Sequence, residues 1–181
     1  NGLSSIQNLY AVGEVSNTGL HGANRLASNS LIEALVFGKR AGEHAGQLIA
    51  EESEDLIAPR LVGDIDSSER TELDMADVRS SLRSLMWRNV GIERHAAHLE
   101  AAREIIDFWS RYVLDKIFDS PAGWELQNML EVAAIVTRAA ALRTESRGVH
   151  HRTDFPTTDD ALWKVHIDWQ TQRPAPMLSA V

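Results

Sequence analysis

The chain has 181 residues, of which 44% are hydrophobic, ordinary values for a globular protein with one good core or two small ones. Its net charge of −8 argues against a nucleic-acid partner, and no apolar run approaches the roughly 20 residues that span a bilayer, so we expect no membrane segment. The absence of cysteine excludes disulfides, thiolate metal sites and cysteine nucleophiles, and it fits a cytoplasmic location.

The first predicted element is a short strand over residues 9–15, apolar on both faces like strands inside parallel α/β sheets. No other strand of comparable quality follows, and a lone strand cannot pair its backbone groups. We therefore expect the chain to be the C-terminal part of a longer protein. By themselves, residues 1–49 are expected either to be poorly ordered or to associate with a second copy.

A loop over residues 16–28 leads into a long predicted helix, with Ser28 or Asn29 as its N-cap. Apolar residues recur along this helix at helical spacing, which predicts one buried side. The predicted apolar stripe consists of Leu31, Leu35, Ala41, Ala45, Leu48 and Ile49.

Residues 51–73 show no sustained period and are rich in acidic residues, which is typical of a linker. The sequence is therefore predicted to divide into a first segment over residues 1–50 and a second domain over residues 74–181. A linker of this kind lets the second domain fold around a core of its own.

The second domain shows three amphipathic helical patterns, over residues 74–90, 93–118 and 123–146. Their connections are short, which favours antiparallel neighbours and a three-helix bundle. A short helix is predicted over residues 159–170, followed by a mobile tail. The expected fold class is mainly α, a C-terminal three-helix bundle preceded by the strand, loop and helix of an α/β domain.

The loop between the first strand and the first helix could bind a ligand. Glu14 follows the strand, where ligands bind in open α/β sheets, although a solvated loop acid fits as well. Arg25 could grip a carboxylate or take part in a surface ion pair, and His21 could donate to a ligand or serve the structure alone. The N–H groups of residues 29–31 suit an anion or the electron-rich end of a flavin, or belong to a plainly capped helix.

The segment over residues 145–156 is rich in Arg, His and Asp. Its adjacent His150 and His151 lack a recognised ligand spacing to a third histidine or carboxylate, so we predict no metal site. A buried or interfacial hydrogen-bond network that fixes this loop against another domain is the favoured interpretation.

Five segments together carry a family resemblance. The strongest are residues 13–14 (GE) and 18–31 (TGLHGANRLASNSL), and the others are residues 86–92 (MWRNVGI), 128–130 (NML) and 145–156 (ESRGVHHRTDFP). In this order they resemble the succinate dehydrogenase/fumarate reductase flavoprotein family, and within it the L-aspartate oxidases, so that the resemblance covers nearly the whole chain.

The resemblance implies an FAD-dependent oxidation of L-aspartate to iminoaspartate, which feeds quinolinate and NAD synthesis. It implies that residues 1–50 belong to an FAD-binding domain. Glu14 is then similar to the acid that contacts FAD, and Ser30 and Leu31 to the residues whose backbone contacts the flavin. Arg25 is similar to a ligand of the substrate carboxylate.

The family's dinucleotide fingerprint, its capping domain and its catalytic arginine lie upstream of the region that this sequence represents. The resemblance therefore implies no catalytic residue in this chain, and we expect the chain alone neither to bind FAD tightly nor to oxidise aspartate. Two alternatives stay open: a flavoprotein of the fumarate reductase or succinate dehydrogenase complexes, and a stand-alone helical interaction module.

Overall fold

The computed structural model describes residues 1–51, 74–113, 116–118, 120–170, 173 and 175–181, which belong to two compact units, Asn1–Val62 and Gly63–Val181. The linker predicted over residues 51–73 lies, apart from Glu51, outside the described residues. Within the described ranges, no helix combines the length and the apolar composition that crossing a membrane requires.

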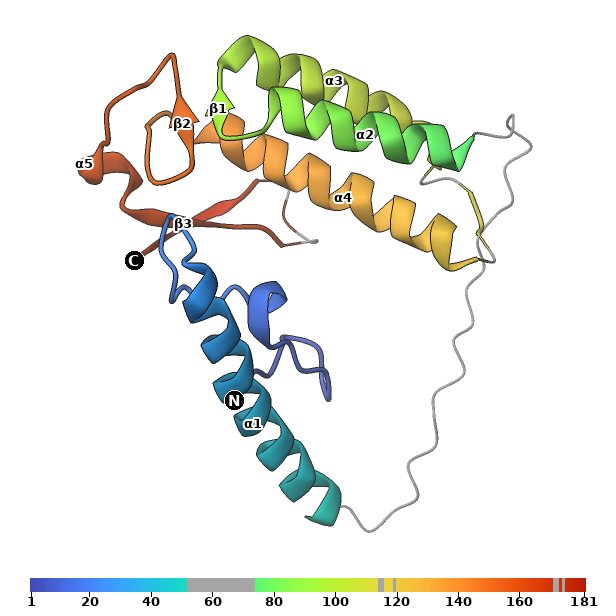
Figure 1. The fold of residues 1–181 in the computed structure, drawn as a ribbon, viewed down its shortest axis with the longest axis vertical. Coiled ribbons are helices and arrows are strands. Elements are labelled where there is room, and N and C mark those ends of the chain that lie inside the picture. The colour runs from blue at the N-terminus through green and yellow to red at the C-terminus, as the bar shows by residue number, and fades with distance from the viewer. Residues whose placement is uncertain (52–73, 114–115, 119, 171–172, 174) are drawn as a thin grey trace. The chain divides into compact units, whose positions relative to one another are not determined.

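The first unit contains one long helix, α1 (Ala27–Glu51), preceded by a short 3-10 helix, η1 (Gly13–Ser16) (Figure 1). The buried residues of α1 are Glu33 and Ala41, so the stripe predicted for it is largely wrong. The exposed members of that stripe are Leu31 (77%), Leu35 (75%), Leu48 (38%) and Ile49 (59%). An apolar surface of this kind suits a further partner. The self-association predicted for residues 1–49 stays a prediction, which sedimentation of the purified chain would test.

The strand predicted over residues 9–15 does not form. Tyr10 makes an isolated antiparallel bridge to Leu3. Gly13 then takes a φ of 76°, outside the extended region, and begins the 3-10 helix. A Cβ on Gly13 would lie 3.3 Å from the Cβ of Ala34 in α1, so the chain turns closely against the helix at this point. This unit offers the apolar run no neighbouring strand among its described residues. The hydroxyl of Tyr10 instead lies 2.6 Å from Nδ1 of His44 in α1, whereas Leu9 (49%) and Val15 (79%) stay exposed.

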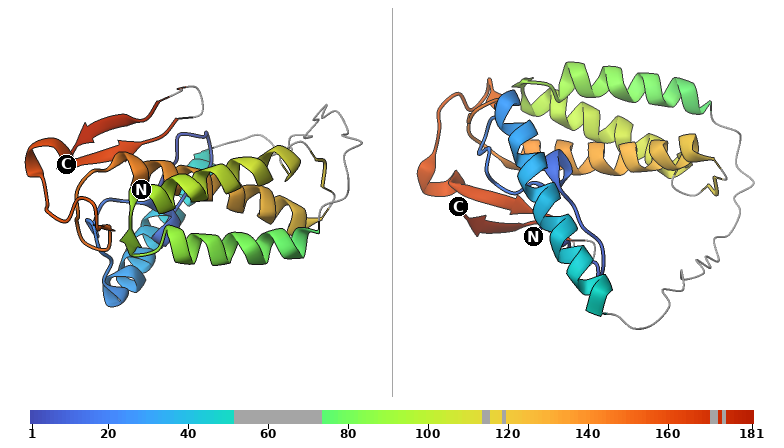
Figure 2. Two further views of the ribbon diagram at one scale, coloured as in Figure 1. Left: turned by 90° about the horizontal axis from the view of Figure 1, so that it is seen from above. Right: turned by 60° about the horizontal axis from the view of Figure 1, so that its bottom comes forward.

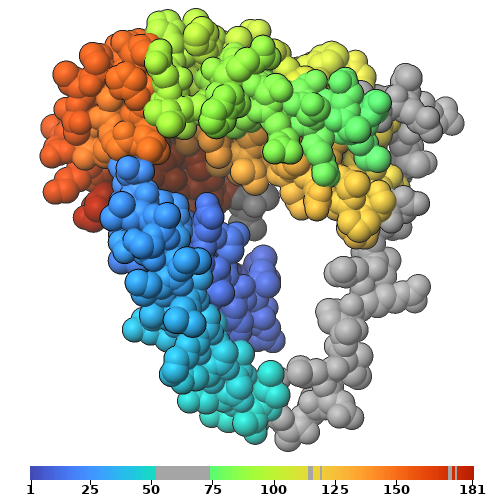
Figure 3. All heavy atoms as spheres, in the orientation of Figure 1, coloured from blue at the N-terminus to red at the C-terminus, as the bar shows by residue number. Residues whose placement is uncertain are grey.

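The second unit is built on three helices, α2 (Met75–Asn89), α3 (Ala96–Val113) and α4 (Pro121–Leu142), which lie side by side in all views (Figures 1 and 2). In the space-filling view, α2 and α4 share one continuous surface (Figure 3). The mainly α fold with a C-terminal three-helix bundle is thus confirmed. The largest apolar side chains that are almost completely buried in it are Leu82, Leu99, Ile106, Leu126 and Leu130.

The bounds of α2 and α4 follow from local sequence. The side chain of Asp74 accepts hydrogen bonds from the N–H groups of Ala76 (2.9 Å) and Asp77 (3.1 Å), which caps α2. Pro121 is the first residue of α4, where its fixed φ suits the helix and its missing N–H is not needed.

The helix predicted from residue 93 begins only at Ala96. Glu93 and Arg94 form a short strand, β1 (Glu93–Arg94), which pairs in parallel with β2 (His151–Arg152). The N–H of Ala96 donates to Asp154 Oδ2 at 3.1 Å, so a residue far along the chain stabilises the start of α3. Local periodicity cannot reveal such a cap.

Of the helix predicted over residues 159–170, only the first turn forms. A short helix, α5 (Asp160–Trp163), is followed by β3 (Val165–Asp168), which pairs antiparallel with β4 (Met177–Ala180). Apolar and polar residues alternate in VHID, a period of two that favours a strand. The tail expected to be mobile therefore supplies a strand.

Candidate functional site

One buried carboxylate organises the loop before α1. The side chain of Glu33 is fully buried and accepts hydrogen bonds from three residues of that loop. Thr18 Oγ1 donates to its Oε1. His21 Nε2 donates to its Oε2 at 2.7 Å, and Arg25 Nη2 donates to the same oxygen at 3.1 Å. We call Glu33 with Thr18, His21 and Arg25 the Glu33 cluster.

The loop reaches the helix because two glycines let it turn back. Gly19 and Gly22 have φ values of 81° and 56°, which favour glycine, and the N–H of Gly22 donates to the carbonyl of Gly19. The turn brings His21 and Arg25 toward α1. The structure thus joins two predicted ligand residues that the sequence merely placed in one loop.

The guanidinium of Arg25 is held at two points. Its Nε donates to Ser30 Oγ at 3.2 Å, and its Nη2 donates to Glu33. The Arg25 side chain keeps 33% of its surface exposed, and its Nη1 makes no hydrogen bond within the described part of the chain. A fixed guanidinium with N–H donors to spare suits the binding of a carboxylate.

The charges of the Glu33 cluster also bear on the binding of a carboxylate. Hydrogen bonds from Thr18 and His21 lower the pKa of Glu33 despite its burial, and the charges of His21 and Arg25 lower it further. Glu33 therefore stays ionised near neutral pH. Its single negative charge balances the positive charge of Arg25.

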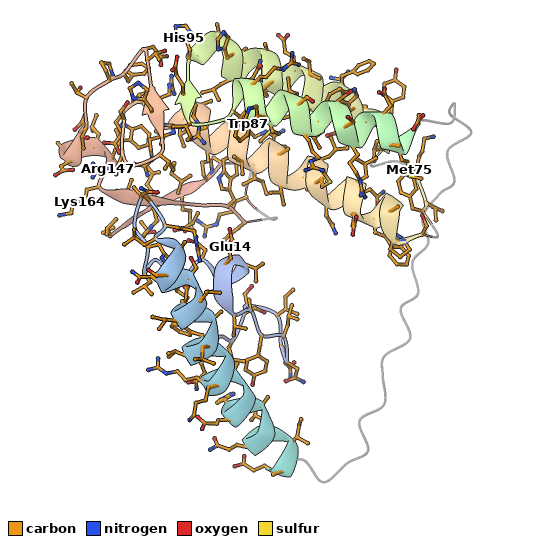
Figure 4. All side chains as sticks on the ribbon, viewed as in Figure 1. Glu14, Met75, Trp87, His95, Arg147 and Lys164 are labelled. Carbon is orange, nitrogen blue, oxygen red and sulfur yellow. The ribbon has the colours of Figure 1, made fainter. Side chains whose placement is uncertain are left out.

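The other predicted ligand residues lie near the cluster in sequence. Glu14 is in η1 with an exposed side chain, and Figure 4 labels it. Ser30 and Leu31 lie in the first turns of α1, which begins at Ala27, before the predicted caps. The prediction of free N–H groups over residues 29–31 is wrong for Asn29 and Ser30, because both donate to the carbonyl of Leu26.

The described residues fit part of a flavin site. Glu14 offers an exposed carboxylate that can accept hydroxyl hydrogen bonds, and Leu31 offers an exposed apolar surface that can contact a ring. Gly19 and Gly22 have open space where a Cβ would be, so backbone can approach a ligand there. Among the described residues we find no set of N–H and cationic groups that suits a diphosphate.

From the sequence alone, no role was predicted for Glu33. A signal was available, because Glu33 precedes Phe37 and Ala41 at intervals of four and so shares their helix face. Glu33 and Ala41 are buried and Phe37 is half-buried. An acid on the buried face of a helix calls for cationic or hydroxyl partners.

The loop after α4 contains the predicted hydrogen-bond network. Glu145 is fully buried and accepts from Arg143 Nη1 (2.7 Å), from the N–H of Asp159 (2.8 Å) and from two nitrogens of Arg147, which Figure 4 labels. Burial by itself would raise the pKa of Glu145, but these hydrogen bonds lower it to about 2. The network fixes the loop within its own unit.

Arg152 belongs to the same network and binds the C-terminal end of α4. Its guanidinium is 2% exposed and binds both carboxylate oxygens of Asp154, at 2.8 and 2.7 Å. Its Nη1 donates to the carbonyls of Ala140, Ala141 and Arg143, which helix geometry leaves unpaired. This role is structural.

His150 is a neutral member of the network. Its Nε2 donates to the carbonyl of Arg143 at 3.2 Å and its Nδ1 accepts from Arg94 Nη1 at 2.6 Å, so both ring nitrogens are used. Burial lowers the pKa of His150 to about 4, and the nearby charges of Arg94, Arg143 and Arg152 act in the same direction. Within the described residues, no group of three His, Cys, Asp or Glu side chains is placed to hold a metal ion.

These values predict an acid-sensitive second unit. Because the pKa of His150 is depressed on folding, the unfolded chain binds the proton first, and stability falls as pH drops from about 6.5 to about 4. We expect a loss of about 2–3 kcal/mol across this window, measured by urea unfolding at a series of pH values. His150→Gln should flatten the profile, whereas His151→Gln, at an exposed neighbour, should leave it unchanged. A wild-type profile that is flat between pH 6.5 and 4 would contradict the prediction.

Comparison with known proteins gives two family matches. A family described as "Fumarate reductase flavoprotein C-term" matches residues 79–179, more than half of the chain. A second, described as "FAD binding domain", matches residues 1–31, which include the loop of the Glu33 cluster.

Individual relatives agree with these matches. The chain is 41% identical to an L-aspartate oxidase of Halalkalibacterium halodurans over 93% of its length. It is 37% identical over 92% of its length to a fumarate reductase (CoM/CoB) polypeptide of Methanothermobacter marburgensis. It spans about a third of each of these relatives (32%).

Among solved structures, a quinol-fumarate reductase with menaquinol molecules matches 96% of the chain with a TM-score of 0.71 at 26% identity, and the chain covers 34% of it. Sdh1 of Mycobacterium smegmatis, in complex with UQ1, matches 95% of the chain with a TM-score of 0.66 at 28% identity, and the chain covers 31% of it.

Proposed function

The chain belongs to the succinate dehydrogenase/fumarate reductase flavoprotein family, and on this basis we propose that it serves as the C-terminal part of an FAD-dependent L-aspartate oxidase. The proposed reaction removes two electrons and two protons from L-aspartate and yields iminoaspartate, which enters quinolinate and NAD synthesis. A cytoplasmic location is part of the proposal.

The observation that carries the proposal is the fixed, partly exposed guanidinium of Arg25. Glu33 and Ser30 hold two of its nitrogens, and its remaining N–H groups can pair with a carboxylate of the substrate. A dicarboxylic substrate fits this site better than a neutral one, because the cluster retains no excess negative charge. Arg25 thus binds and orients the substrate.

The proposed cofactor contacts come from the same loop and helix. Glu14 would accept hydroxyl hydrogen bonds from FAD. Because the N–H of Ser30 is already bonded to the carbonyl of Leu26, the flavin contact proposed for the first turns of α1 is the exposed Leu31. When bound, FAD supplies the acceptor for the hydride that leaves the substrate.

The test uses the complete flavoprotein that carries this chain. We expect it to form hydrogen peroxide in the presence of L-aspartate and oxygen, and to reduce a dye with succinate much more slowly. Succinate-dependent dye reduction without aspartate-dependent peroxide would overturn the proposal. That result would favour the second candidate, a flavoprotein of the fumarate reductase or succinate dehydrogenase complexes, which the structural matches support.

A stand-alone helical interaction module is a third candidate, since the second unit has its own apolar core. The gene itself separates this candidate from the others. An upstream continuation of the reading frame that contains a GxGxxG fingerprint would exclude a stand-alone module.

The 181-residue chain alone is expected to bind FAD weakly and to oxidise no aspartate. Its sequence contains no GxGxxG motif, and the described residues offer no diphosphate site, so the dinucleotide part of FAD has no binding site that we can identify among them. Equilibrium dialysis of the purified chain against FAD would measure this. Stoichiometric FAD with aspartate turnover would refute the expectation.

A further inference from the structure

Glu33 occupies an unusual position for a carboxylate. Its side chain is fully buried, within the first two turns of α1, yet it contacts no substrate candidate directly. Its two oxygens instead receive all three polar side chains that the loop directs at the helix. The same helix face continues with the half-buried Phe37 and the buried Ala41.

If Glu33 only packed the loop against α1, its side chain would not need a charge. Burying a carboxylate is costly unless cations and hydrogen bonds compensate it, and an apolar side chain would attach the loop at lower cost. The carboxylate of Glu33 instead sets the orientation of the side chain that it binds. It fixes Nη2 of Arg25 while Ser30 fixes Nε, so a long flexible side chain loses its freedom before any ligand binds.

We propose that Glu33 is the positioning residue of the substrate site, which acts through Arg25 and His21 to hold them in the orientation that receives the substrate carboxylate. This inference rests on the proposed function for the identity of the substrate. It assigns Glu33 no contact with substrate or flavin.

The first test is Glu33→Gln in the complete flavoprotein. The variant keeps the size of the side chain but places an amide N–H₂ against donors, so Arg25 loses its anchor. We expect the KM for aspartate to rise by about tenfold or more, while kcat stays within about threefold, because positioning in the free enzyme affects substrate binding first. The matched control is Glu43→Gln, which removes the same charge from an exposed pair with Lys39 on the same helix and should change neither constant.

The second test is a double-mutant cycle with Arg25→Lys. If Glu33 acts through Arg25, adding Glu33→Gln to the Arg25→Lys enzyme should change the KM by less than about twofold. A purely structural role would make the two effects additive. Additive effects, or an unchanged KM in the Glu33→Gln enzyme, would overturn the proposal.

A milder variant covers the case in which Glu33→Gln does not fold. Thr18→Val removes one hydrogen bond to Oε1 and leaves the contacts of His21 and Arg25 with Oε2 in place. A rise in KM of about two- to threefold with full FAD content supports the proposal, and an unchanged KM overturns it.

Measuring kcat and KM with succinate as well distinguishes a failure of this inference from a failure of the proposed function. An enzyme that oxidises succinate but not aspartate would refute the aspartate oxidase. The succinate KM of the Glu33→Gln enzyme would still decide the role of Glu33.

Discussion

Replacing Arg25 by lysine in the complete flavoprotein is expected to lower kcat/KM for aspartate by about two to three orders of magnitude. Lysine keeps the charge but loses the planar fork, so it cannot bond Ser30 and Glu33 and still pair with a carboxylate. Steady-state kinetics at saturating oxygen measure the effect, with FAD absorbance as the check on folding.

The matched control for Arg25 is Arg40→Lys. Arg40 lies on α1 with its guanidinium 5.5 Å from the centre of the Phe37 ring, and its side chain is exposed. This variant should keep kcat/KM within about twofold of the wild type, since an exposed cation–π contact contributes little. An Arg25→Lys enzyme with full FAD content and unchanged kcat/KM would refute the assigned role of Arg25.

Replacing Arg152 by methionine is expected to destabilise the second unit by about 3–5 kcal/mol. The change removes both guanidinium hydrogen bonds to the carboxylate of Asp154 and the side-chain donor to the carbonyls of Ala140 and Ala141. All five tryptophans lie in residues 74–181, so tryptophan fluorescence during urea unfolding of the chain follows this unit alone.

Arg138→Met, an exposed arginine on α4, provides the comparison. Arg138 is 48% exposed and its Nη2 lies 3.4 Å from Asp107, a surface ion pair whose loss should cost no more than about 1 kcal/mol. Equal midpoints for the Arg152→Met and wild-type chains would show that the network around Arg152 is dispensable.

The candidate ligand residues in and around the loop before α1 were predictable from the sequence, but their contacts were not. A motif points to Arg25, Glu14, Ser30 and Leu31, yet spacing along the chain does not show which groups they meet. Arg25 pairs with Glu33 eight residues away because two glycines reverse the loop. The N–H groups expected to be free at Asn29 and Ser30 are used because α1 starts earlier, at Ala27.

The helical fold was predictable for a physical reason. In α2 and α4 the apolar residues repeat at the period of the helix itself. The cap of α2 at Asp74 and the proline that begins α4 are encoded next to the turns that they stabilise. The order of residues along the chain is therefore enough to specify the three-helix bundle, its core and the family to which the chain belongs.

The remaining features depend on tertiary contacts. The start of α3 depends on β-pairing with His151–Arg152 and on a cap from Asp154, and the C-terminal strand exists because β3 and β4 satisfy each other's backbone. Glu33 becomes the centre of the site only when the loop folds back onto α1. Each of these features needs a contact between residues that local sequence does not relate, and only the folded chain provides it.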